Sequence, residues 1–327
     1  MTQEEKFLRL LYSPYKANVL LALEMGNALP EIDLQKHLED FRELYRLMMD
    51  QEASQEINPS EIIKITQADY AILQRQELTN LPRVLWYCNN LQSLDLEGNL
   101  LTSLPDELKN LLNLTHLYLN RNSLTRFPEG IKYLSKLEHL DLFANKLTSV
   151  LGSIGELRQL KELHLEVNEL THLPEEIGQL VGLQLFHMQR NSIKALPTTI
   201  GKLTLLESLR CQENELAFLP KEVGKLRLLK DLNLSENKLT VLPEEIGQLS
   251  LLEELDLHDN QLTSLPREVC ELSSLRELDL MNNNLITLPE EIGQLNSLRS
   301  LSLKGNPLPS NEVQKIRQCL SDCEILF

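Results

Sequence analysis

Ten asparagines recur along this chain at one unbroken interval of 23 residues. They are Asn99, Asn122, Asn145, Asn168, Asn191, Asn214, Asn237, Asn260, Asn283 and Asn306. A repeat of fixed length between about 20 and 50 residues is typical of a solenoid, in which each coil packs on the coil before it and the coil after it. The interval therefore constrains the fold of most of the chain.

Leucines keep the same spacing around each asparagine, as in the segment Leu-Lys-Asp-Leu-Asn-Leu-Ser-Glu-Asn that spans 229–237. Leucines at the first, fourth and sixth positions with an asparagine at the ninth are the pattern of leucine-rich repeats. The alternation indicates a β-strand whose fourth and sixth side chains face a core, while the third, fifth and seventh face the other way. Because a full coil of chain separates successive strands, these strands are predicted to be parallel.

The rest of each repeat reads Leu-Pro-Glu-Glu-Ile-Gly-Gln-Leu or a close variant. Proline fixes φ and favours the start of a short helical turn, and the glycine suits a tight turn on the convex side. The asparagine follows the strand, where its amide is predicted to satisfy backbone groups of its own coil and of the adjacent one. The ten asparagines are therefore assigned a structural role, as a hydrogen-bonded ladder.

Three domains are predicted. The leucine-rich repeats span 68–309, with regular repeats from residue 91 and a degenerate first repeat at 68–90, where Gln76 replaces the asparagine. Residues 1–67 have helical spacing of apolar residues and are predicted to form a helical N-terminal cap whose third helix begins after Asp33. A separate partner-binding module is the alternative for this segment. Residues 310–327 are predicted to form a C-terminal cap, with a helix N-capped by Ser310 and a short edge strand.

Charge and cysteine content exclude several classes of partner. The formal net charge of −16 argues against nucleic acid and against an anionic membrane surface, since both require clustered Lys and Arg. No signal peptide or transmembrane segment is visible, and the five cysteines are better explained as thiols in a reducing compartment than as disulfides. A cytoplasmic protein is therefore expected, with secretion by a non-classical or specialised system as the alternative.

The full repeat resembles that of the intracellular, Ras-group leucine-rich repeat proteins, and is especially similar to the pure-repeat proteins of spirochaetes and Bacteroidetes. The ending Gly305-Asn-Pro-Leu-Pro309, followed by a helix and a short strand, resembles the ending of those bacterial proteins. The resemblance implies an α/β repeat solenoid, a right-handed horseshoe with a concave parallel β-sheet and short helical or 3-10 convex segments. It also implies a protein-binding role. Val150-Leu151 in place of Leu-Pro, and Cys270 in place of the convex glycine, depart from the pattern.

The register assigns side chains to the concave face, and these are the candidate partner-binding residues. They are His116, Tyr118, His139, Asp141, Phe143, His164, Leu185, His187, Arg210, Asp231, Glu254, Asp256, Glu277 and Asp279. The histidines and aromatic residues at 116–187 are predicted to form one patch, because exposed aromatic residues are enriched in binding hot spots. The acidic residues at 231–279 are predicted to repel one another across strands, and a basic partner would relieve this repulsion.

Several functions remain open. The principal prediction is a non-catalytic protein–protein interaction scaffold that binds a protein partner on its concave sheet, and a monomer is expected. The alternatives are an exported effector or surface-exposed host-binding protein, and a structural or oligomerising spacer. No cofactor or catalytic residue is predicted, since no Gly-x-x-x-x-Gly-Lys-Ser/Thr loop occurs. The columns bring several imidazoles within reach of one another, but no outer shell can be argued, so no metal site is predicted.

Overall fold

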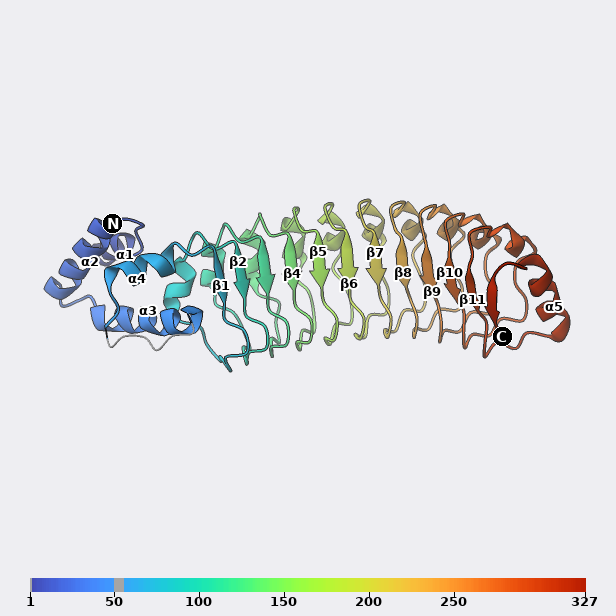
Figure 1. The fold of residues 1–327 in the computed structure, drawn as a ribbon, viewed down its shortest axis with the longest axis horizontal. Coiled ribbons are helices and arrows are strands. Elements are labelled where there is room, and N and C mark those ends of the chain that lie inside the picture. Colours follow the sequence, from blue (N-terminus) through green and yellow to red (C-terminus); the bar gives the residue numbers. More distant parts are fainter. Residues whose placement is uncertain (1, 50–55) are drawn as a thin grey trace. The chain divides into compact units, whose positions relative to one another are not determined.

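The computed structural model describes residues 2–49 and 56–327. Contacts divide the chain into two compact units, Met1–Leu124 with Pro128–Leu140, and Thr125–Phe127 with Asp141–Phe327. Both are built from coils of the same design, with a three-residue strand on one side and a 3-10 turn on another (Figure 1). The leucine-rich-repeat solenoid predicted from the sequence is therefore confirmed.

Four helices precede the strands of the first unit. They are α1 (Gln3–Leu11), α2 (Lys16–Ala28), α3 (Leu34–Met49) and α4 (Pro59–Thr66). The amide of Lys36 donates to Oδ1 of Asp33 at 3.1 Å, which is the N-cap predicted for the third helix. Helix α4 was not predicted, although Asn58 and Glu61 form a capping box around Pro59 at its start.

The strands follow the 23-residue period. They are β1 (Tyr70–Ile72), β2 (Ser93–Asp95), β3 (His116–Tyr118), β4 (His139–Asp141), β5 (Glu162–His164), β6 (Leu185–His187), β7 (Ser208–Arg210), β8 (Asp231–Asn233), β9 (Glu254–Asp256), β10 (Glu277–Asp279), β11 (Ser300–Ser302) and β12 (Glu324–Leu326). In the first unit β1 pairs with β2 and β2 with β3, and in the second unit β5 to β12 pair in chain order. Every one of these pairs is parallel, as predicted, and in the pairs among the repeats equivalent repeat positions face each other.

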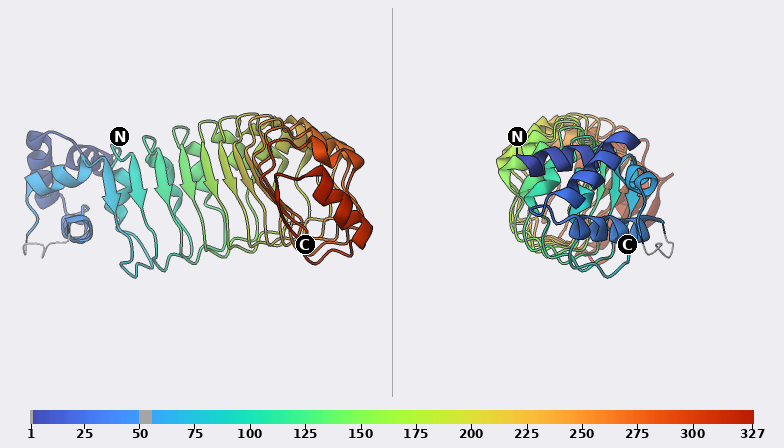
Figure 2. Two further views of the ribbon diagram at one scale, coloured as in Figure 1. Left: turned by 45° about the vertical axis from the view of Figure 1, so that its right-hand side comes forward. Right: turned by 90° about the vertical axis from the view of Figure 1, so that its left-hand side faces the viewer.

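A 3-10 helix closes each coil on the side away from the strands (Figure 2). These helices are η1 (Arg83–Tyr87), η2 (Asp106–Asn110), η3 (Glu129–Tyr133), η4 (Gly152–Glu156), η5 (Glu175–Gln179), η6 (Thr198–Lys202), η7 (Lys221–Lys225), η8 (Glu244–Gln248), η9 (Arg267–Glu271) and η10 (Glu290–Gln294). A proline at the N-cap precedes nine of them, and Leu151 takes that place before η4 with φ −76°. The departure at Val150-Leu151 therefore leaves the turn intact.

The core lies between the strand layer and the 3-10 turns. Leucines at the fourth and sixth strand positions, such as Leu232 and Leu234, are fully buried. Cys211 replaces one of them and is equally buried, and burial raises the pKa of its thiol. Burying a leucine side chain stabilises the fold by roughly 2 kcal/mol, so the leucines at the repeated positions supply most of the stabilisation.

The convex glycines have a different role from the one predicted. A Cβ built on Gly178 would lie 2.5 Å from the carbonyl oxygen of Thr199 in the next coil, and Gly201 makes the same close approach to Glu222. Neither residue has a positive φ. Both glycines lie in the tight convex turn that was predicted, since Gly178 is part of η5 and Gly201 part of η6, but glycine is required there because adjacent coils pack too closely for a side chain.

The chain ends in α5 (Ser310–Cys319) and β12, as the sequence predicted. Ser310 is the first residue of the helix, however, and the N-cap is Pro309, which makes no side-chain hydrogen bond. The predicted Ser310 cap is therefore wrong. Glu312 in the first turn instead accepts hydrogen bonds from Oγ1 of Thr287 at 3.0 Å and from the amide of Leu288 at 3.1 Å. These bonds attach α5 to the last coil.

Candidate functional site

In the described residues of each unit, one face of the strand layer is not covered by any helix or strand (Figure 1). It is formed by the third, fifth and seventh side chains of each repeat, and we call it the open sheet face. The fourth-position side chain is buried in every strand from β2 to β11, so the side chains on either side of it point outward. The candidate partner-binding residues all lie at these outward positions.

In the first unit the open sheet face is aromatic. The imidazole rings of His116 and His139 stack with centroids 4.3 Å apart and planes 9° apart, and Tyr118 lies 6.3 Å from His116. On β1 the side chains of Tyr70 and Ile72 are 61% and 51% exposed. Extending the third- and fifth-position columns into the degenerate repeat would have identified these two residues, which the sequence analysis missed.

The first candidate residues of the second unit lie on β5, β6 and the segment before β5. The amide of Phe143 donates to Oδ1 of Asp141 at 2.9 Å, and both side chains are half-buried. Parallel pairing sets Leu185 beside Glu162 and His187 beside His164. The two imidazoles meet edge to face, with ring centroids 5.1 Å apart. They therefore form a close pair instead of two separate exposed rings.

The acidic candidates occupy β8, β9 and β10 in two columns. Pairing sets Glu254 between Asp231 and Glu277, and Asp256 beside Asp279. Nε of Arg210 lies 2.7 Å from Oδ2 of Asp231, which neutralises one end of the first column. The remaining carboxylates face like charge on neighbouring strands about 4.8 Å away.

Two pKa shifts follow from this crowding. Burial, together with the charges of Asp231 and Glu277, raises the pKa of Glu254. Burial and the neighbouring Asp256 likewise raise the pKa of Asp279, against a hydrogen bond from a backbone amide that lowers it. Both directions mean that the folded chain resists ionisation of these groups. A cation on this part of the open sheet face would remove that resistance.

The asparagines lie beside the end of each strand and bridge neighbouring coils. Nδ2 of Asn214 donates to the carbonyl of Cys211 in its own coil at 3.0 Å and to that of Met188 in the preceding coil at 3.1 Å. Its Oδ1 accepts from the amide of Ile193 at 2.9 Å. The same three bonds recur at Asn237, Asn260 and Asn283. The ladder therefore holds coils together and presents no reactive group to solvent.

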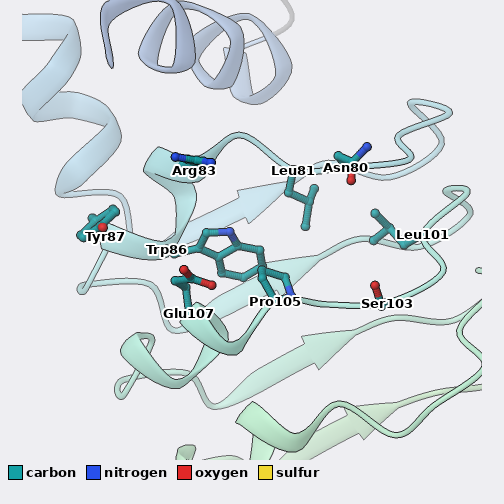
Figure 3. Close-up of a pocket in the computed structure, with 9 residues that line it drawn as sticks. All are labelled: Asn80, Leu81, Arg83, Trp86, Tyr87, Leu101, Ser103, Pro105 and Glu107. Atoms are coloured by element: carbon teal, nitrogen blue, oxygen red, sulfur yellow. The ribbon is translucent and has the colours of Figure 1, made fainter. Parts of the chain in front are cut away.

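A cavity of about 550 Å³ in the first unit lies near η1, with Trp86 at its centre (Figure 3). Its lining residues are Asn80, Leu81, Arg83, Trp86, Tyr87, Leu101, Ser103, Pro105 and Glu107. Arg83 and Glu107 are the only charged side chains among them, and no histidine or cysteine accompanies them.

All five cysteines are free thiols, at positions 88, 211, 270, 319 and 323. Burial raises the pKa of Cys88 to about 12, which makes this thiol a packing group and not a nucleophile. Across residues 2–49 and 56–327, none of the helices combines the length and the apolar character that a membrane span requires.

Comparison with known proteins defines the family. The model of the leucine-rich repeat region matches residues 28–170, 145–234 and 219–321. The chain belongs to the leucine-rich repeat proteins. A search of curated protein sequences found no match. In such proteins stacked repeats present an extended surface.

Solved structures agree with this assignment. A leucine-rich repeat protein of Leptospira interrogans is 38% identical, with a TM-score of 0.70 over 82% of this chain and 74% of its own. The ectodomain of the Arabidopsis thaliana receptor kinase GASSHO1/SCHENGEN3, solved in complex with CASPARIAN STRIP INTEGRITY FACTOR 2, is 33% identical, with a TM-score of 0.65 over 76% of this chain. The plant peptide hormone receptor RGFR1, solved in complex with RGF2, is 28% identical, with a TM-score of 0.64 over 77%. This leucine-rich repeat chain spans 31% and 46% of those two receptor chains.

Proposed function

We propose that this leucine-rich repeat protein is a non-catalytic scaffold that binds a protein partner on its open sheet face. The observation that carries the proposal is a surface that folding alone does not account for. Tyr70 and Ile72 expose more than half of their side chains on β1, and Glu254 stands between two further acidic side chains. Apolar exposure and like-charge repulsion both cost stability, and a bound partner relieves both.

The two units favour different contacts. Aromatic side chains such as Tyr70 and Tyr118 suit apolar anchors of a partner, since tyrosine is enriched among residues that dominate binding energy. The columns of β8 to β10 suit a segment rich in Lys and Arg, because they carry acidic groups whose pKa values are raised. Two of the similar structures were solved with protein or peptide ligands, which supports a binding role without indicating the partner of this chain.

We also propose that the terminal segments, 1–67 and 310–327, cap the repeats. A solenoid requires polar caps, because its end coils would otherwise expose core leucines. The rings of Tyr12 in the N-terminal segment and Tyr87 in η1 stack with centroids 4.4 Å apart. Helix α3 packs on η1 and β1, and α5 packs on η10. With both ends covered in this way, a monomer is the expected state, and sedimentation velocity at several concentrations tests it.

Affinity capture from the native cells, followed by mass spectrometry, tests the proposed function. The open-face variant Glu254→Lys with Glu277→Lys reverses the acidic column. The matched control, Glu244→Lys with Glu290→Lys, makes the same charge change on η8 and η10. We expect the control to capture the same partner as the unmodified chain and the open-face variant to lose it. Retention by the open-face variant together with loss by the control would place binding on the opposite side.

A further inference from the structure

Three side chains of the second unit converge on the open sheet face between β5 and β6. His164 ends β5, Glu166 follows it by two residues, and His187 pairs with His164 on the neighbouring strand. Oε1 of Glu166 lies 3.2 Å from Nδ1 of His164 and 3.5 Å from Nδ1 of His187. One nitrogen of each ring and one carboxylate oxygen all lie within 4.8 Å of one another.

The hydrogen bonds of His187 determine which of its nitrogens carries hydrogen. Oγ of Ser208 donates its single hydrogen to Oδ2 of Asp231 at 2.8 Å, since a carboxylate only accepts. Oγ of Ser208 also lies 3.3 Å from Nε2 of His187. Because its only hydrogen is already donated to Asp231, Oγ must accept a hydrogen bond from that nitrogen. In the neutral ring, Nδ1 then bears a lone pair. That lone pair faces the carboxylate of Glu166, and the two repel unless a cation lies between them.

Glu166 is itself built into the chain as a buried anion. Glu166 is 7% exposed, and its Oε2 is buried without a hydrogen-bond partner. Nε2 of Gln189 approaches Oε1 at 3.4 Å. Nδ1 of His164 is hydrogen-bonded to the same Oε1 at 3.2 Å, so the carboxylate has its polar contacts on one oxygen only. A buried carboxylate with one unpaired oxygen lowers the stability of the fold, so packing alone does not account for its position beside two imidazoles.

We propose that His164, Glu166 and His187 form a binding site for Zn²⁺. Two imidazole nitrogens and a carboxylate are ligands that zinc takes at about 2.0–2.2 Å, and a tetrahedral site then has ligand–ligand separations of about 3.3–3.5 Å. The distances from Oε1 of Glu166 to Nδ1 of His164 and to Nδ1 of His187, 3.2 and 3.5 Å, are close to these separations. Three protein ligands leave a fourth position open toward the open sheet face, where water completes the coordination.

The surroundings supply the outer shell that zinc sites require. A ligating histidine almost always donates its other N–H to a carboxylate, carbonyl or water, which fixes the ring. His187 does so through Ser208 to Asp231, and Nε2 of His164 lies 3.8 Å from Oε2 of Glu162. Mg²⁺ and Ca²⁺ prefer oxygen ligands throughout, so the two imidazoles disfavour them.

A second cluster in the same unit is less suited to a metal. Asp256, His258 and Asp279 also bring donor atoms within 4.8 Å, but all three side chains are half-buried. Nδ1 of His258 is already hydrogen-bonded to Oδ1 of Asp256 at 2.7 Å. The corresponding bond of the first cluster, between Nδ1 of His164 and Oε1 of Glu166, is longer at 3.2 Å and leaves Oε2 of Glu166 buried and unpaired, whereas no buried, unpaired side-chain atom is found in the second cluster. This cluster serves as the internal alternative in the test below.

The test is titration of the chelator-treated full chain with Zn²⁺ in the presence of a chromophoric competitor. We expect one zinc per chain, and we expect the bound Co²⁺ form to show the absorption of four-coordinate cobalt without a thiolate charge-transfer band. His187→Ala and Glu166→Gln should each weaken binding by more than the 10- to 100-fold that loss of an outer-shell partner typically costs. Ser208→Ala should fall within that smaller range.

Two controls make the result decisive. His172→Ala removes a histidine outside the cluster, and His258→Ala disables the second cluster, so neither should change the affinity. Circular dichroism and urea unfolding of each apo variant separate loss of the site from loss of the fold. Unchanged zinc affinity in folded Glu166→Gln, a loss confined to His258→Ala, or a thiolate band from Cys319 or Cys323 would overturn the proposal.

Discussion

The asparagine ladder predicts a specific pattern of coupling between neighbouring repeats. Each strand-end carbonyl accepts from two asparagines, one in its own coil and one in the next. The carbonyl of Cys211, for example, accepts from Asn214 at 3.0 Å and from Asn237 at 3.1 Å. Replacing one asparagine with leucine therefore leaves every such carbonyl with a donor and isolates a single amide, that of Ile193 for Asn214.

The magnitudes follow from this count. Asn214→Leu and Asn237→Leu each isolate one buried N–H, so each should lower the free energy of unfolding by about 1–3 kcal/mol. The double variant isolates both amides and also removes both donors from Cys211. A further buried acceptor without a partner should add roughly 1–2 kcal/mol beyond the sum of the single effects. Asn214 and Asn260 share no carbonyl, so that double variant should be additive.

Urea unfolding of the three single and two double variants, analysed as two double-mutant cycles, measures the coupling directly. A coupling for the adjacent pair and none for the separated pair is the expected outcome. Equal additivity in both cycles would refute the shared-carbonyl account. Asn306→Leu provides a further comparison, since Asn306 is less buried and no asparagine follows it in the ladder, and its loss should cost less than that of Asn214.

Other predictions concern single positions. Gly178→Ala should lower the free energy of unfolding by about 1–3 kcal/mol, because its Cβ would meet the backbone of the next coil, whereas Gly152→Ala should cost little because only the flexible side chain of Glu176 opposes it. Val167 has φ 54°, and Val167→Asn should raise the free energy of unfolding by about 1 kcal/mol, since a β-branched residue is strained there; a loss in the same urea assay would contradict this reasoning. Because the folded pKa of Glu254 is raised, its penalty is present above that pKa and absent below the unfolded value. Glu254→Gln should therefore stabilise the chain at about pH 7 by a few tenths of a kcal/mol and lose that gain below about pH 4, whereas an equal gain at both would contradict the charge argument.

Much of the fold could be predicted because one period fixes everything that is equivalent between coils. Once Asn214 and Asn237 are aligned, the strand, the 3-10 turn and the outward positions of every repeat follow. Features that do not repeat were harder to predict from the sequence. Helix α4 is only eight residues long, so its apolar spacing is weak, although the Asn58–Glu61 capping box marks its start. At the start of α5, Pro309 occupies the cap position without a side-chain hydrogen bond, so the polar side chain of Ser310 did not mark the helix boundary.

The candidate site could be predicted only as columns of residue types. The sequence sets His164 and His187 on adjacent strands, but it does not say which ring nitrogen faces Glu166. That depends on side-chain rotamers and on a relay from His187 through Ser208 to Asp231, which the 23-residue register places on neighbouring strands without fixing its hydrogen bonds. The convex glycine is similar, because the distance between coils at Gly178 is a result of packing and not of local sequence.

Carboxyl footprinting tests the central claim, that the open sheet face binds the partner, most directly. The chain is labelled with a carbodiimide and an amine, with and without the captured partner, and each carboxylate is quantified by mass spectrometry. The account predicts that the partner protects Glu254 and Glu277 on β9 and β10, whereas Glu244 and Glu290 on η8 and η10 label equally in both states. Protection of Glu244 and Glu290 with unchanged labelling of Glu254 and Glu277 would contradict it.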